Sequence, residues 1–243
     1  DTIADASDIV DLKVKVDNFN VDTITTIIEN AATIGTNAAT ITSALAITGG
    51  IEAVTITGAI SAADTNIIAN ATSGIVTATI TSGAVSSTLA AITHVNTSDV
   101  ITFTTTDTSV DASDLVALAL KVDTLGVNSV TTITEAYNTA NVATVVTNAL
   151  NITGNTELVS ITGGSILATD VNTILGATSG NVTAIVTADT AAALNTALTN
   201  ATSADALTLT VNGATATASD LISLDGKTNI AISVTATSVS GTF

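Results

Sequence analysis

The sequence predicts a right-handed solenoid of about nine coils, each built from one parallel β-strand and a short α-helix. Three observations lead to this α/β solenoid: an internal repeat of 106 residues, a shorter period of Thr-rich segments within it, and a hydrophobic fraction of 46% with only 2% aromatic residues. A narrow core of small aliphatic side chains suits identical stacked coils. A right-handed parallel β-helix with three strands per coil is the alternative architecture.

The long repeat is marked by the tripeptide Ala-Ser-Asp, which ends at Asp8, Asp114 and Asp220, 106 residues apart each time. Ala71-Thr72-Ser73-Gly74 returns at the same offset as Ala177-Thr178-Ser179-Gly180. We therefore expect one continuous solenoid with a super-repeat over residues 1–106, a second over residues 107–212 and the start of a third over residues 213–243.

Within each super-repeat, four short segments alternate β-branched or aliphatic residues with threonine. This period-two alternation predicts strands with an aliphatic face turned inward and a row of threonines turned outward. The series includes Ala184-Ile185-Val186, in which we expect Ile185 to point inward. The candidate threonine face consists of Thr23, Thr25, Thr55, Thr57, Thr79, Thr81, Thr102, Thr104, Thr132, Thr134, Thr162, Thr208 and Thr210.

Helices are predicted between these strands. Leu115 and Leu118 follow Ala112-Ser113-Asp114 at helical spacing, and similar runs follow the other repeat positions. An aspartate at the start of each run suits the free N–H groups of a first helical turn. We therefore assign Asp8, Asp64, Asp114, Asp170 and Asp220 as helix caps. Because successive strands occupy like positions, they are expected to be parallel, with right-handed crossovers through the helices.

The composition excludes several classes of function. The chain carries 21 acidic residues against four lysines, for a net charge of −17, so it should repel nucleic acid and anionic membranes. No apolar stretch approaches the ~18 residues of a membrane-spanning helix. The absence of cysteine excludes disulfides and thiolate metal sites. Because the chain begins with Asp1 and contains no methionine, we expect a processed piece or a section of something longer.

Catalytic and cofactor sites are not expected. His94 is the sole histidine, its counterpart in the second super-repeat is Asn200, and no aromatic cluster suggests sugar stacking by a carbohydrate-active enzyme. We predict no enzyme activity and no cofactor. Structural calcium, held by carboxylates on adjacent coils, is the one metal role left open; the sequence has no Asp-x-Asp-x-Asp-Gly loop.

The segment from Ala218 to Thr228, followed by Val234-Thr235-Ala236-Thr237, resembles repeats of very large surface proteins of cyanobacteria and other aquatic bacteria. The resemblance lies in Ala/Ser-Asp-Leu helices, Thr-rich strands and an acidic, cysteine-free chain. It implies an extracellular or cell-surface location and a role in a surface layer, matrix filament or giant adhesin. It carries over no catalytic residue.

The function expected from these features is structural. Solenoid ends expose core and sheet edge unless they are capped, so the chain is expected to partner itself, by end-to-end or lateral stacking or within a longer covalent array. The alternative is a solenoid that binds ice or another regular polymer through its threonine face.

Overall fold

The computed structural model describes residues 1–18, 20–31, 37–137 and 141–241. Strands and helices alternate along these residues, and every described strand pair is parallel. The chain forms two compact units, residues 1–107 with 117–128, and residues 108–116 with 129–243. We describe each unit by itself.

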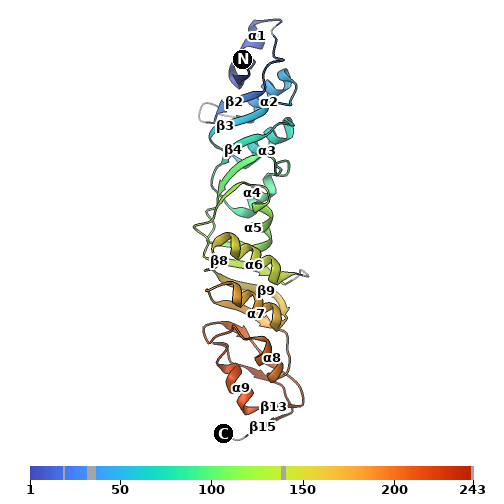
Figure 1. Ribbon diagram of the computed structural model, residues 1–243, viewed down its shortest axis with the longest axis vertical. Coiled ribbons are helices and arrows are strands. Elements are labelled where there is room, and N and C mark those ends of the chain that lie inside the picture. The colour runs from blue at the N-terminus through green and yellow to red at the C-terminus, as the bar shows by residue number, and fades with distance from the viewer. Residues whose placement is uncertain (19, 32–36, 138–140, 242–243) are drawn as a thin grey trace. The chain divides into compact units, whose positions relative to one another are not determined.

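The first unit contains a six-stranded sheet in the order β1-β2-β3-β4-β5-β7 (Figure 1). Paired residues in adjacent strands are 20 to 27 positions apart in the sequence. The chain therefore leaves the sheet after each strand and returns one connecting segment later to form the next. The strands are β1 (Ile3–Asp5), β2 (Thr26–Asn30), β3 (Ala53–Ile60), β4 (Val76–Ile80), β5 (Val100–Thr104) and β7 (Thr124–Gly126). The helices are α1 (Ala6–Lys15), α2 (Asn37–Thr48), α3 (Ala62–Ala71) and α4 (Val85–Ala91).

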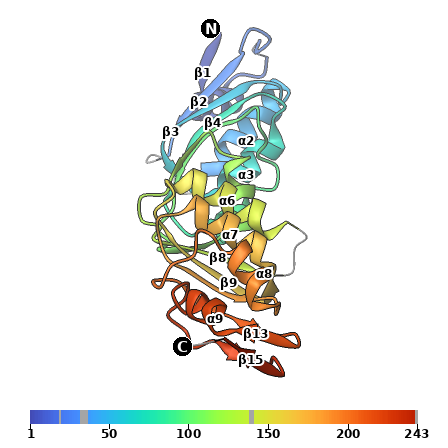
Figure 2. The ribbon, with the colours of Figure 1, turned by 60° about the horizontal axis from the view of Figure 1, so that its bottom comes forward.

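The second unit contains a five-stranded sheet in the order β11-β10-β9-β8-β6 and two smaller pairs, β12 with β14 and β13 with β15 (Figure 2). Its strands are β6 (Ser109–Asp111), β8 (Thr132–Ala136), β9 (Leu158–Ile166), β10 (Val182–Val186), β11 (Ala206–Thr208), β12 (Thr210–Val211), β13 (Thr215–Thr217), β14 (Ser233–Val234) and β15 (Ser238–Ser240). Its helices are α6 (Val142–Thr153), α7 (Ala168–Ala177), α8 (Ala191–Ala197) and α9 (Ala218–Asp225). Helix α5 (Ala112–Ala119) has residues in both units.

The elements of the two units follow the sequence repeat. Strand β8 lies one repeat length after β2, and helix α7 and strand β10 follow α3 and β4 at the same offset. This alternation of strands and helices on parallel sheets is the predicted α/β arrangement, and it is compatible with a solenoid-like fold. One detail differs from the prediction. More than one strand precedes α5, α6 and α9, because the long extended segments before these helices pair over separate short stretches.

The core lies between the sheet and the helices of each unit. In β4 the inward side chains Val76, Ala78 and Ile80 are buried, and in α3 Ile68 is buried as well. Burial of such aliphatic side chains stabilises by ~25 cal/mol per Å² of apolar surface removed from water. Phe103 is the one aromatic residue among the largest fully buried side chains. Each strand–helix layer (one strand segment with the helix that follows it) therefore buries few apolar side chains, and it depends on its neighbours to cover them.

Helix α6 and the start of β9 follow α2 and the start of β3 by 105 residues, and a longer bulge in β9 restores the offset of 106. In β3, Thr55 faces Thr77 and Ala59 faces Thr79, so four steps along β3 oppose two along β4. In β9 five steps oppose two along β10. Gly58 and Gly163 adopt positive φ angles of 82° and 84° within these bulges, a conformation that glycine adopts without steric cost. The additional residue in β9 restores the offset of the repeat downstream.

Candidate functional site

The threonine face predicted from the sequence is exposed at least in part at all thirteen positions. Ten of the threonines lie within strands, whereas Thr23 and Thr25 precede β2 and Thr81 follows β4. In six of these segments the central residue is buried, as predicted: Ile56, Ile80, Phe103, Ile133, Ile161 and Leu209.

Strand register breaks this face into short columns. In the first unit Thr79, Thr102 and Thr124 lie side by side on three successive strands. A second column pairs Thr55 with Thr77, but Ile28 and Val100, both partly exposed, occupy its two ends. The exposed hydroxyl groups therefore do not form one uniform array across the sheet.

The second unit has no directly paired threonines among its described strands. Its longest hydroxyl column runs from Thr134 through Ser160 to Thr183. Leu158 and Ile185, each 50% exposed, interrupt the same sheet face. The expectation that Ile185 points inward was wrong: Ala184 and Val186 are buried instead. Strand β10 buries the same positions as β4: Ala184 and Val186 are the counterparts of Ala78 and Ile80 in the first repeat, which are also buried.

The five aspartates assigned as helix caps lie in the first turn of α1, α3, α5, α7 and α9. The cap position belongs to an earlier residue. In α3 the cap is Ser61, which accepts a hydrogen bond from the Asp64 N–H and donates from its hydroxyl to the Asp64 carboxylate. Thr217 and Asp220 repeat this arrangement in α9. Asp64 and Asp220 thus hold the capping hydroxyl, and all five aspartates place negative charge in the first helical turn, where the helix dipole favours it.

Among the residues that the structure describes, six carboxylates have a role that the sequence patterns did not reveal. Each accepts a hydrogen bond of 2.8–3.1 Å from a backbone N–H that lies 22 or 23 residues earlier, on the preceding strand–helix layer. Such charge-assisted bonds are roughly twice as strong as neutral ones. The acceptor and donor pairs are Glu29 with Ser7, Asp99 with Val76, Asp107 with Val85, Asp123 with Ile101, Glu135 with Ser113, and Asp205 with Val182.

Two of these acceptors recur at the offset of the repeat, Glu29 as Glu135 and Asp99 as Asp205, and all four are buried. Recurrence of a carboxylate at a buried position was the signal available in the sequence. These buried carboxylates therefore join successive layers by accepting backbone N–H groups of the layer before.

Glu135 lies close to a second carboxylate. Its Oε2 accepts from the Ser113 N–H at 3.0 Å, while the Ser113 hydroxyl donates to Asp111 Oδ1 at 2.6 Å. Burial and then repulsion from Asp111 raise the pKa of Glu135, and hydrogen bonds from Ser113 and Ala136 oppose that rise only in part.

The recurring Ala-Thr-Ser-Gly motif also joins layers. The hydroxyl of Thr72 donates to the Glu52 carbonyl at 2.6 Å and accepts from the Gly74 N–H at 2.9 Å. The hydroxyl of Thr178 likewise donates to the Glu157 carbonyl and accepts from the Gly180 N–H. A Cβ atom on either glycine would overlap the backbone of that glutamate, so only glycine permits this approach.

The lysines of the repeat bind helix ends. Lys121 Nζ donates to the carbonyls of Ile92 and Val95 at 3.1 and 3.2 Å, and Lys227 Nζ donates to the Leu198 carbonyl at 2.6 Å. Ile92 and Leu198 are the C-caps of α4 and α8, where the helix dipole favours a cation. Lys15, at the equivalent position of the first layer, is 71% exposed and lies 3.8 Å from Asp11.

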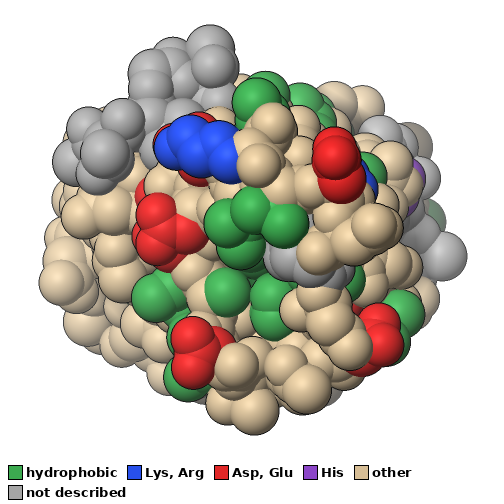
Figure 3. Space-filling view, turned by 90° about the horizontal axis from the view of Figure 1, so that it is seen from above, with side chains coloured by type: hydrophobic (Ala, Val, Ile, Leu, Met, Phe, Trp, Pro, Cys, Tyr) green, Lys and Arg blue, Asp and Glu red, His purple; other side chains and the backbone are tan. Residues whose placement is uncertain are grey.

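A groove of about 330 Å³ opens at the end of the first unit formed by β1, α1 and residues 20–24. Its apolar lining includes Ile3, Ile9, Leu12 and Ile24, and Asp1, Asp5 and Asp8 also border it. Figure 3 shows this end, with hydrophobic side chains near the centre and acidic side chains around them. We call it the end groove.

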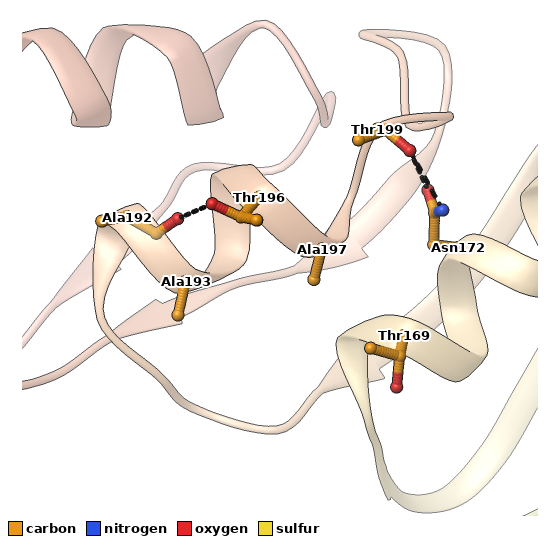
Figure 4. A pocket seen from close by; sticks show the side chains of 7 residues that line it. All are labelled: Thr169, Asn172, Ala192, Ala193, Thr196, Ala197 and Thr199. Carbon is orange, nitrogen blue, oxygen red and sulfur yellow. Dashed lines mark hydrogen bonds between the residues drawn. The ribbon is translucent and has the colours of Figure 1, made fainter.

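A second depression lies between α7 and α8 in the second unit (Figure 4). It is lined by Thr169, Asn172, Ala192, Ala193, Thr196, Ala197 and Thr199. The Asn172 amide donates to the Thr199 hydroxyl at 3.1 Å, which holds two of the lining side chains together. The lining has no titratable or aromatic side chain, so it offers no groups for acid–base chemistry.

His94 occupies a structural position. Its backbone N–H donates to the Asn66 side chain at 2.6 Å, and Asn200 makes the same bond to Asn172 at 2.7 Å. The His94 ring nitrogen Nδ1 also lies within hydrogen-bonding distance of Asn66 Nδ2, at 3.2 Å, and of Thr93 Oγ1, at 3.3 Å. Within the described ranges, no group of three or more His, Cys, Asp or Glu side chains is placed to hold a metal ion.

Over the described part of the chain, no helix is both long and apolar enough to cross a membrane. In comparisons with known proteins, the chain matches no protein-family model, no curated protein and no solved structure.

Proposed function

We propose that the chain is a structural repeat protein of the bacterial cell exterior, a right-handed solenoid of about nine coils that assembles by end-to-end or lateral stacking. One observation carries the proposal: each layer of the repeat is bound to the preceding layer by the same kinds of hydrogen bond. The bonds between layers run through carboxylates and through strand pairing, both of which recur from one layer to the next. A surface built in this way has hydrogen-bonding and apolar groups suited to another layer.

The resemblance to bacterial surface repeats and the strong negative charge support this proposal. A role in a filament, layer, matrix or adhesin stalk requires only that the chain folds and associates with further layers. We propose neither an enzymatic reaction nor a required cofactor.

Sedimentation velocity and negative-stain electron microscopy of the purified chain test this function. We expect the mean sedimentation coefficient to rise with concentration, and stacked particles to appear in the micrographs. A matched sample in about 1 M urea should contain fewer stacked particles if folded surfaces mediate assembly. Monomers alone across a hundredfold range of concentration would contradict the proposal.

Binding of ice or another regular polymer by the sheet face is the second candidate. The column of Thr79, Thr102 and Thr124 is the observation that favours it, because regularly spaced hydroxyl and methyl groups suit a periodic ligand. Thermal hysteresis and ice-recrystallisation assays test it. Activity should be lost in Thr102→Tyr and kept in Thr196→Tyr, which alters an exposed helical threonine. An inactive wild-type chain in both assays removes the ice hypothesis.

A further inference from the structure

We propose that the outward side of the sheet in the first unit is a lateral interface, against which the same sheet of a second copy of this chain packs. We call this surface the outer sheet face. It consists of the residues of β2, β3, β4, β5 and β7 whose side chains point away from the helices, and its middle is formed by Thr55, Thr77, Thr79, Val100 and Thr102. This inference rests on the proposed function, because it names the surface through which copies stack side by side.

The outer sheet face carries no charge, although the net charge of the chain is −17. Glu29 is the sole charged residue in the five strands, and it is buried. Its carboxylate lies on the inner side of the sheet and accepts a hydrogen bond from the Ser7 N–H at 3.1 Å. The sheet therefore buries a carboxylate and leaves its outward side neutral, and depletion of charge is typical of the centre of a protein–protein interface.

Carboxylates lie instead at the margin of the outer sheet face. Asp5, which ends β1, pairs with Ile28 and accepts from the Ser7 hydroxyl at 2.6 Å. Asp99 and Asp123 directly precede β5 and β7, and each accepts a backbone N–H group of the neighbouring strand. A neutral centre with polar groups around it is the usual anatomy of a surface that binds another protein.

The second unit repeats this distribution of charge. Glu135 is the sole charged residue of β8, β9, β10 and β11, and it is buried as Glu29 is. Strand β6 ends on a carboxylate, Asp111, as β1 does. Outward residue types change between the two units, for example from Thr79 to Ile185, but none of these changes introduces a charged residue. The neutral outward side is therefore a property of both sheets and not an accident of one strand.

The distribution of charge favours a second copy as the partner. The helices of the first unit carry partly or fully exposed aspartates, among them Asp8, Asp11 and Asp64. A contact through the helices would bring these carboxylates towards those of the other copy, and like charges oppose association. A contact through two outer sheet faces turns the helices away from each other. Sheets paired in this way lie ~10 Å apart, with their strands within roughly 30° of each other.

The side chains of the outer sheet face suit a protein surface better than ice. Ile28 and Val100, which are 38% and 46% exposed, occupy the two ends of the column formed by Thr55 and Thr77. Aliphatic side chains interrupt a lattice of hydroxyl groups, whereas against a second sheet they would be removed from water together with the threonine methyl groups. Mixed aliphatic and threonine side chains can interdigitate as the inner faces of a β-sandwich do.

The first test measures association of the full chain by sedimentation velocity. Val100→Asp and Thr102→Asp, which place a carboxylate on the outer sheet face, should raise the concentration of half-association at least about tenfold, because two such carboxylates would face each other across the interface. Ile67→Asp is the matched control, since it adds the same charge to helix α3 at a side chain that is 50% exposed. It should associate as the wild type does.

The second test uses the absence of cysteine from the chain, which lets a single introduced cysteine report its own position. Thr79→Cys and Thr102→Cys should give covalent dimers with a bis-maleimide about 10 Å long, which matches the spacing of packed sheets. Ile67→Cys should give few. This measurement adds no charge to the sheet, so it decides the proposal even where the aspartate variants fail to fold.

Equal association of Val100→Asp, Thr102→Asp and Ile67→Asp, with circular dichroism showing all three folded, would overturn the proposal. A wild-type chain that assembles while its face cysteines do not cross-link refutes the outer sheet face alone, whereas a chain that stays monomeric refutes the proposed assembly as well. A monomeric chain that inhibits ice recrystallisation, and loses this effect in Val100→Asp, would show that the face binds ice and not a second copy.

Discussion

At the scale of single residues, the acidic side chains divide by what they meet. Those such as Asp11 lie in solvent and contribute charge, whereas Glu29, Asp99 and Asp205 are buried and accept backbone N–H groups of the preceding layer. A buried N–H without a partner costs ~1–3 kcal/mol, so these carboxylates are structural acceptors as much as charged groups. Burial and then repulsion from Asp111 oppose the ionisation of Glu135 and raise its pKa.

Glu135→Gln should change how stability depends on pH. The pKa of the Glu135 carboxyl is higher in the folded chain than in the unfolded chain. The protonated carboxyl therefore stabilises the fold fully at pH values below its pKa in the unfolded chain, and this stabilisation is lost as the pH rises through its pKa in the folded chain. The free energy of unfolding of the wild type, minus that of Glu135→Gln, should therefore grow as pH falls from 7 towards about 4. Urea titrations at several pH values measure it. Asp111→Asn should reduce the growth, and a difference that shrinks on acidification would contradict the assignment.

Gly74→Ala should destabilise the first unit by about 1–3 kcal/mol, since a Cβ atom would overlap the Glu52 backbone and force two layers apart. Gly180→Ala should have a similar effect at Glu157 in the second unit. Gly83→Ala is the matched control, because its Cβ would meet nothing closer than 3.9 Å. Denaturant unfolding followed by circular dichroism gives all three values. Equal stability of Gly74→Ala and Gly83→Ala would show that the close approach is not required.

At the scale of elements, the helices are short and their ends are tied to other groups. Helices α4 and α8 have seven residues each, below the ~12–15 residues at which isolated helices become even marginally stable in water. Their stability must come from packing and from their ends. The first turns of α3 and α9 are held by Ser61 with Asp64 and by Thr217 with Asp220, and lysines of the following layers bind the C-terminal carbonyls of α4 and α8.

Lys227→Met should therefore lower the stability of the second unit by about 1 kcal/mol, because it removes a charged donor from the C-terminus of α8 while keeping an apolar stem. Hydrogen exchange of the amides of residues 191–198 should accelerate. The same substitution at Lys15 should leave the stability of the isolated chain within about 0.5 kcal/mol, since that side chain is exposed. A neutral effect at both positions would contradict a helix-capping role for Lys227.

At the scale of the whole molecule, the net charge of −17 sets solubility and salt response. With four lysines, two of which are committed to helix ends, little positive charge remains to balance the acidic surface. Self-repulsion of this kind opposes the folded state and opposes association between copies, and dissolved salt screens it over ~8–10 Å at moderate ionic strength. Assembly should accordingly be stronger at higher salt.

Sodium chloride and calcium chloride at equal ionic strength should raise the thermal midpoint equally. The described residues hold no cluster of three potential ligands, and the buried carboxylates already accept N–H groups. Differential scanning calorimetry, with EDTA-treated protein as the reference, makes the comparison. A midpoint several degrees higher in calcium alone would instead support the calcium bridging that the abundance of aspartate left open.

Local periodicity and identities one repeat length apart were enough to predict the repeat, the alternation of strands with short helices and the parallel pairing. The strand face of Ile185, the caps at Ser61 and Thr217, and the partners of Glu29 and Asp205 could not be predicted in this way. Each depends on how one layer registers on the next. A carboxylate such as Glu29 or Asp205 bonds to an N–H group about 22 residues earlier in the chain. This pairing depends on two segments that are distant in the sequence and adjacent in space, so local sequence patterns do not predict it.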